Sequence, residues 1–139
     1  MYEKAYALLG ENPKAMQDTT GALAVIRKGL YLSSVNTATE TLGIHQKLFI
    51  PLIGGSVRSF QRKKDTDRLT PQQTEHTLAI LNILAEAEDY FGDRESALTW
   101  IKTNKVAFAN QSPLDYCDTM SGIDYVLDEI NKLKHGMTA

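Results

Sequence analysis

The chain has 139 residues, of which 42% are hydrophobic and 23% are charged, a composition typical of one or two small globular domains. No apolar run approaches the roughly 18 residues of a membrane span, and the single cysteine, Cys117, excludes an internal disulfide and fits a reducing compartment. The first residues lack the apolar segment of a secretory signal, so we expect a cytoplasmic protein without a membrane partner.

The net charge of −2 conceals an asymmetry between the two halves of the chain. Residues 1–70 contain ten Lys and Arg against six Asp and Glu, a balance of +4, whereas residues 71–139 contain five against eleven, a balance of −6. A basic half joined to an acidic half is typical of a protein with two partners, one carrying phosphate and the other basic. Chance can also produce an imbalance of this size, so both interpretations stay open.

Helix punctuation recurs in the first half, and alternating strand patterns are almost absent. Helices are predicted within residues 1–10, 18–29 and 32–43, each ending at a glycine. The third is expected to begin at an N-cap formed by Ser33 or Ser34.

A capping box opens the second half, where Thr70 and Gln73 flank Pro71 at the first helical position. The helix that follows has a broad apolar arc and is predicted to be central and buried, ending near Gly92. The residues of this arc are Leu78, Ile80, Leu81, Ile83, Leu84 and Ala87.

Three further helix starts are predicted, at Asp93, Ser112 and Ser121. The last helix ends at Gly136. Its inward face is formed by Ile123, Val126, Leu127, Ile130 and Leu133. Together these signals predict an all-α fold.

Catalytic and metal-binding patterns are weak in this sequence. The three histidines, His45, His76 and His135, are far apart and lack a cysteine pair, so no metal site is expected. Cys117 lies between two aspartates, which raise a thiol pKa, and is interpreted as a small buried residue. Because the acidic cluster within residues 86–95 is interpreted as a solvated surface, we expect no enzyme activity and no cofactor.

Residues 44–64 are predicted to form a helix-turn-helix. "HQKLFIPLI" supplies the first helix, "GG" the turn and "VRSFQRKK" the second helix, with Val57 and Phe60 facing inward. The outward residues are of types that contact bases and phosphates. Predicted DNA-binding residues are Ser56, Arg58, Ser59, Gln61, Arg62 and Lys63. A plain solvated helix, with Ser56 only as its cap, is the alternative.

The span from about Gly29 to Gly136 resembles the Xre-type antitoxins of bacterial RES–Xre toxin–antitoxin pairs, a group that includes MbcA-like and ParS-like relatives. The resemblance rests on "GLYLSSVNTATETLGI", "SVRSFQRKK" and several separated markers. These markers are Phe91-Gly92-Asp93, Ala97, Trp100-Ile101, Asn104, Ala107, Ser112-Pro113-Leu114 and Lys134-His135-Gly136. It implies an Xre-like helix-turn-helix DNA-binding region within residues 1–69, followed by a linking helix and a toxin-binding domain within residues 70–139.

The resemblance also implies a function. A member of this family binds and neutralises a RES-domain toxin that degrades NAD, and represses its own operon by binding operator DNA. A homodimer is expected because helix-turn-helix proteins read two-fold sites. A stand-alone helix-turn-helix repressor is the alternative, and an adaptor whose helix-turn-helix has decayed is a third reading.

The implied toxin-binding residues lie in the loop after the Trp100 helix and at the end of the last helix. They are Asn104, Phe108, Asn110, Lys134, His135 and Met137. Simple packing is the alternative for Phe108 and Asn110, and Trp100 is expected in the core.

Two residues depart from the helix-turn-helix pattern. Pro51 falls inside the first helix, where it removes a backbone hydrogen bond and is expected to kink or shorten that helix. Gly55 occupies a turn position at which the pattern prefers an apolar side chain.

Overall fold

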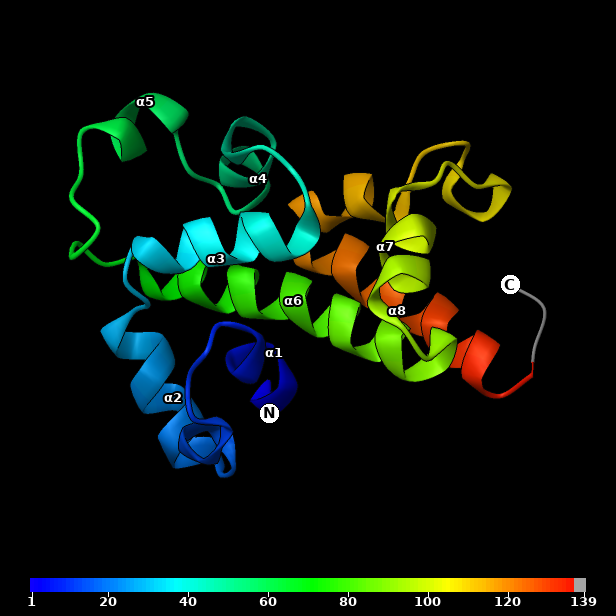
Figure 1. The fold of residues 1–139 in the computed structure, drawn as a ribbon, viewed down its shortest axis with the longest axis horizontal. Coiled ribbons are helices and arrows are strands. Elements are labelled where there is room, and N and C mark those ends of the chain that lie inside the picture. The colour runs from blue at the N-terminus through cyan, green and yellow to red at the C-terminus, as the bar shows by residue number, and fades with distance from the viewer. Residues whose placement is uncertain (137–139) are drawn as a thin grey trace. The chain divides into compact units, whose positions relative to one another are not determined.

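The computed structural model describes residues 1–136 and confirms the all-α prediction (Figure 1). Within these residues the chain forms helices and two isolated β-bridges, and no strand. It divides into two compact units, residues 1–81 and residues 82–139. The predicted domain boundary at residues 69–70 lies just before the helix within which the two units divide, and it stays a prediction.

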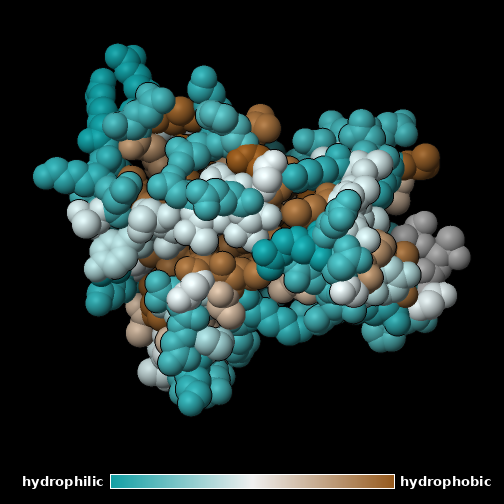
Figure 2. Space-filling model, in the orientation of Figure 1, coloured by the Kyte–Doolittle hydropathy of each residue, from teal (hydrophilic) through white to brown (hydrophobic). Residues whose placement is uncertain are grey.

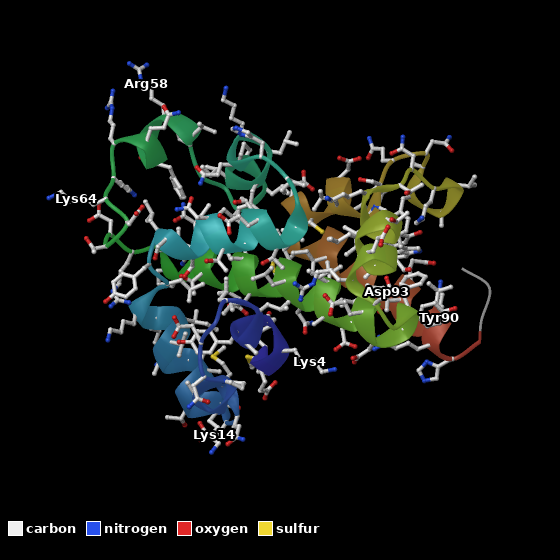
Figure 3. The ribbon with its side chains drawn as sticks, in the orientation of Figure 1. Lys4, Lys14, Arg58, Lys64, Tyr90 and Asp93 are labelled. Carbon is white, nitrogen blue, oxygen red and sulfur yellow. The ribbon has the colours of Figure 1, made fainter. Side chains whose placement is uncertain are left out.

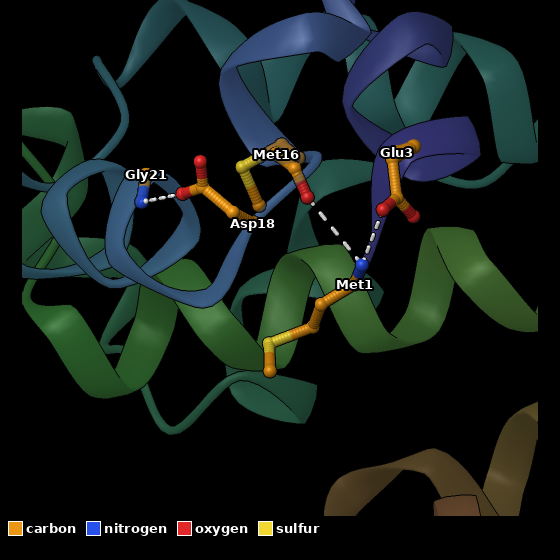
Figure 4. Close-up of polar contacts among 5 residues, drawn as sticks. All are labelled: Met1, Glu3, Met16, Asp18 and Gly21. Atoms are coloured by element: carbon orange, nitrogen blue, oxygen red, sulfur yellow. Dashed lines mark hydrogen bonds and ion pairs between the residues drawn. The ribbon is translucent and has the colours of Figure 1, made fainter.

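The first unit is built from short helices. They are α1 (Glu3–Leu8), the 3-10 helix η1 (Pro13–Met16), α2 (Thr19–Lys28), α3 (Ser33–Leu42), α4 (Gln46–Leu52) and α5 (Val57–Gln61). Asp18 caps α2 by accepting a hydrogen bond from the Gly21 amide at 2.7 Å, and the Met1 amino group donates to the Met16 carbonyl at 3.4 Å (Figure 4). The helices predicted within residues 1–10, 18–29 and 32–43 are all present.

The predicted cap of α3 is wrong. Ser33 is the first residue inside the helix, and Leu32 precedes it. The amides of Leu32 and Ser33 donate to the backbone carbonyls of Asp67 and Asp65, at 2.8 and 3.3 Å. A distant chain segment therefore satisfies the first two donors at the start of α3, and no side chain caps this helix.

The segment that supplies these carbonyls returns from α5 and forms a clamp with residues 29–32. The Leu69 amide donates to the Leu30 carbonyl at 2.8 Å, and Arg68 donates to the Gly29 carbonyl at 2.7 Å. The Arg68 guanidinium also lies 4.0 Å from the centre of the Tyr31 ring. These contacts anchor the chain segment that follows α5 to the segment that precedes α3.

Helix α6 (Pro71–Phe91) begins with the predicted capping box. Thr70 and Gln73 exchange hydrogen bonds between side chain and backbone, both at 3.1 Å. The predicted apolar arc is buried throughout, which confirms the predicted burial of this helix. Gly92, with φ of 87°, follows its last residue, as predicted.

The second unit continues through four further elements. They are α7 (Arg94–Lys102), the 3-10 helices η2 (Val106–Phe108) and η3 (Pro113–Asp118), and α8 (Met120–Lys134). Asp93 caps α7, and Ser112 forms a full capping box with Asp115, as predicted, although this box opens a 3-10 helix. The start predicted at Ser121 is wrong because Thr119 caps α8, accepting from the Gly122 amide at 2.9 Å.

Among residues 1–136, no helix is both long and apolar enough to span a bilayer.

Candidate functional site

The predicted helix, turn and cap of the basic region lie where expected in the first unit. Helix α4 ends at Leu52, Gly54 takes a left-handed conformation with φ of 76°, and the Gly55 amide donates to the Ile50 carbonyl at 2.9 Å. The Ser56 hydroxyl then caps α5 by accepting from the Ser59 amide at 3.3 Å. Helix α5 is thus held against α4 by a tight glycine turn.

The second helix is shorter than predicted. Helix α5 ends at Gln61, Arg62 is its C-cap, and Lys63 follows it. The chain then turns, and the Lys64 amide donates to the Asp67 carboxylate at 2.9 Å. This turn leads the chain into the clamp with residues 29–32.

The six predicted DNA-binding residues are all exposed on this element, whereas Phe60 is only 9% exposed and faces inward as predicted. Figure 3 shows Arg58 and Lys64 pointing away from the ribbon. The surface around them is hydrophilic in Figure 2. We call the cations of this element the basic tip, defined as Arg58, Arg62, Lys63 and Lys64.

The departure at Gly55 has a steric reason. A Cβ atom there would lie 2.9 Å from both Ile50 Cγ2 and Phe60 Cε1. The Phe60 ring therefore occupies the space of the apolar turn residue in the pattern. Pro51 lies in the last turn of α4, and the helix ends one residue later, consistent with the predicted shortening.

An aromatic cluster forms the centre of the second unit, with Phe108 at its middle. The Phe108 ring centroid lies 6.0 Å from that of Trp100, 5.1 Å from Tyr116 and 5.2 Å from Tyr125, each edge to face. Phe91 extends the cluster from the end of α6, 6.2 Å from Trp100. Trp100 itself is half-buried. Such edge-to-face pairs add stability beyond the burial of the rings.

Phe108, one of the predicted toxin-binding residues, is 1% exposed and packs inside the unit. The packing alternative describes it in this structure. Asn104 and Asn110 are exposed, and the structure brings them together in one turn between α7 and η3. Asn110 adopts a left-handed φ of 64° there.

The other predicted toxin-binding residues lie at the end of α8. Lys134 pairs with Glu86 and lies 3.9 Å from the Asp89 carboxylate, near the end of α6 that bears the labelled Tyr90 (Figure 3). The ring of His135 contacts the Asn131 carbonyl at 2.7 Å. Met137 lies outside the described residues.

Tyr125 was not among the predicted site residues. It lies on α8, which ends at Lys134, and it contacts the turn that carries Asn104 and Asn110. Its hydroxyl donates to the Ala107 carbonyl at 2.5 Å, which ties α8 to the turn that carries Asn104 and Asn110. Tyr125 also lines a shallow hollow of about 340 Å³ on α8, and His135 lines the same hollow. The sequence signal that could have selected Tyr125 was its position on the predicted outer face of an amphipathic helix.

Nucleophilic chemistry at Cys117 has no support. Burial, together with the charges of Asp118 and Asp115, raises the pKa of the Cys117 thiol to about 12. The thiol donates to the Pro113 carbonyl at 3.4 Å. At neutral pH it is therefore protonated, as the sequence analysis expects. In the described part of the chain, no group of three His, Cys, Asp or Glu side chains is placed to hold a metal ion.

The second unit coincides with a known domain type. Residues 86–136 match the antitoxin Xre/MbcA/ParS C-terminal toxin-binding domain. The all-α fold and this match define an antitoxin with a toxin-binding domain at its C-terminal end.

Two relatives extend the similarity over most of the chain. An antitoxin Xre from Yersinia enterocolitica is 33% identical over 114 residues, which cover 81% of this chain and 77% of the relative. An antitoxin Xre from Photorhabdus laumondii is 22% identical over 118 residues, which cover 84% and 80%. The chain therefore belongs to the Xre antitoxin family and is a type II antitoxin. This membership favours a non-enzymatic regulatory protein.

Proposed function

We propose that this antitoxin binds and neutralises a RES-domain toxin that degrades NAD. The match of residues 86–136 to a toxin-binding domain carries the proposal. Charge supports it, because residues 82–139 contain ten Asp and Glu against five Lys and Arg, a balance of −5. A cleft that accepts an anionic dinucleotide is expected to be basic, so an acidic partner is attracted to it and associates faster.

Co-expression tests this proposal directly. The test requires that the neighbouring gene encodes a RES-domain protein. When this protein is induced, growth should stop and cellular NAD should fall, and the full chain should restore both. Purified chain should also form a complex with that protein and inhibit NAD loss in vitro, more slowly at high salt because association is steered by charge. A chain that neither binds nor inhibits this toxin, but binds operator DNA, would support the stand-alone repressor instead.

We also propose that the antitoxin represses its own operon as a homodimer, through the basic tip. The tip presents four exposed cations beside a capped helix, which suits phosphate contact. Helix α5 has only five residues, so Arg62 and Lys63 approach DNA from the turn that follows it. Base reading then falls to Arg58, Ser59 and Gln61.

Replacing Arg62 and Lys63 by alanine should weaken binding to the DNA upstream of the gene. Each lost phosphate contact should also flatten the log–log salt dependence of the binding constant by about 0.9. The matched control replaces Lys14 and Arg27, an exposed pair in the same unit with the same charge. Fluorescence anisotropy from about 50 to 200 mM salt measures both slopes. An unchanged slope for the tip variant, or an equal loss for the control, would support the alternative that α5 is only a solvated surface helix.

A further inference from the structure

The turn of residues 103–112, which we call the apical turn, has a backbone closed by its own hydrogen bonds. The Lys105 amide donates to the Gln111 carbonyl at 3.0 Å. The Lys105 carbonyl accepts from the amides of Phe108 and Asn110, at 3.1 and 2.9 Å. Ala109 and Asn110 complete the reversal in left-handed conformations. The apical turn is therefore an ordered structure rather than an open loop.

Side chains fix the apical turn to the unit beneath it. Phe108 enters the aromatic cluster, and the Tyr125 hydroxyl holds the Ala107 carbonyl at 2.5 Å. The Lys105 ammonium lies 5.3 Å from the centre of the Trp100 ring, and partial burial lowers the pKa of Lys105. Anchored at these three points, the turn has little freedom to move on binding.

Val106 is displayed at this anchored turn. It is 88% exposed, more than any other large hydrophobic side chain among the described residues. A small group of hydrophobic atoms is visible in Figure 2 at the edge where this turn lies in Figure 1. Lys105 is the sole charged residue of the turn, in a chain that is 23% charged. Depletion of charge around an apolar side chain is typical of the centre of a protein interface.

We propose that Val106 is the apolar anchor of the toxin interface, entering an apolar hollow on the toxin while the amides of Asn104 and Asn110 hydrogen-bond around it. The proposal rests on the proposed function, and the apical turn lies inside the matched toxin-binding domain, residues 86–136. A rigid turn loses little conformational entropy on association, so burial of the valine contributes nearly in full to affinity. This assignment moves the contact from buried Phe108 to its exposed neighbour two residues earlier.

Affinity measurements with variants of the full chain test this assignment. The dissociation constant is measured by calorimetry against the purified RES-domain protein encoded beside this chain. Val106→Ala should weaken binding about 10-fold, and Val106→Asp at least about 100-fold, because a carboxylate would be desolvated in an apolar hollow. Urea unfolding, followed by the fluorescence of Trp100, should be the same for both variants and the unchanged chain. Met120→Asp introduces the same charge at another exposed apolar position of this unit and should change affinity less than about threefold.

The outcomes separate the anchor from the proposed function. If the unchanged chain does not bind this toxin, the proposed function and the proposed anchor are both wrong. If it binds and Val106→Asp binds equally well, the anchor alone is overturned. An equal loss in Met120→Asp would overturn it too, because the effect would then follow from a carboxylate added at any exposed apolar position of this unit. A change of oligomeric state in Val106→Asp with unchanged toxin affinity would assign Val106 to contacts between copies of the chain.

Discussion

Phe108→Ala is expected to lower the free energy of unfolding of the second unit by about 3–5 kcal/mol, the usual range for a buried aromatic side chain. Phe108 is 1% exposed and contacts three other rings. Its removal leaves a cavity at the centre of the cluster and frees the apical turn. Trp100 is the sole tryptophan and a member of this cluster, so its fluorescence during urea unfolding reports this unit directly.

Val106→Ala provides the matched control for this variant. It shortens an apolar side chain two residues away on the same turn, at a position that is 88% exposed. Its free energy of unfolding should therefore stay within about 0.5 kcal/mol of the unchanged chain. An unfolding midpoint for Phe108→Ala that matches the control would show that the cluster does not hold this unit together.

Gly122→Ala is expected to destabilise the second unit by about 2 kcal/mol, although alanine is the better helix former by about 1 kcal/mol. Gly122 lies in the first turn of α8, where its amide donates to the cap hydroxyl of Thr119. An added Cβ atom would lie 1.8 Å from the Tyr116 carbonyl oxygen. That oxygen belongs to the backbone of η3, so relief requires α8 and η3 to separate.

Ser121→Ala tests whether helix propensity alone decides the sign of the stability change in Gly122→Ala. Ser121 is the exposed neighbour of Gly122 in the same helical turn. Its replacement should leave stability unchanged or slightly higher, within about 0.5 kcal/mol. If Gly122→Ala unfolds at the same or higher urea concentration than Ser121→Ala, the close approach of α8 and η3 is not a constraint on this residue.

Helix boundaries show how far local sequence determines this fold. The caps at Thr70, Asp93 and Ser112 were predictable because each satisfies backbone donors within three residues of itself. The start of α3 was not, because the carbonyls of Asp65 and Asp67 satisfy its first donors across more than thirty residues. The helical pattern of "VRSFQRKK" also extended α5 too far, because the chain turns after Gln61 toward the distant residues 29–32.

The candidate sites show the same division. The exposure of the basic tip could be predicted because apolar and polar residues fall on opposite faces of a short helix. In the apical turn, Val106 and Phe108 are two apolar residues in an irregular segment without a period. Nothing local distinguishes the buried one from the exposed one, so the pattern did not show that Phe108 is buried and Val106 exposed.

The sequence by itself determined the helical class, the central buried helix, most caps and the separation of basic and acidic halves, because these depend on periodicity, short-range hydrogen bonds and composition. The tertiary structure alone decided which apolar side chain of the apical turn enters the aromatic cluster. It also decided where the chain turns back after α5. The close approach of α8 and η3, which requires glycine at Gly122, likewise exists only in the tertiary structure. Each of these depends on atoms that are distant in sequence and close in space, which no local pattern specifies.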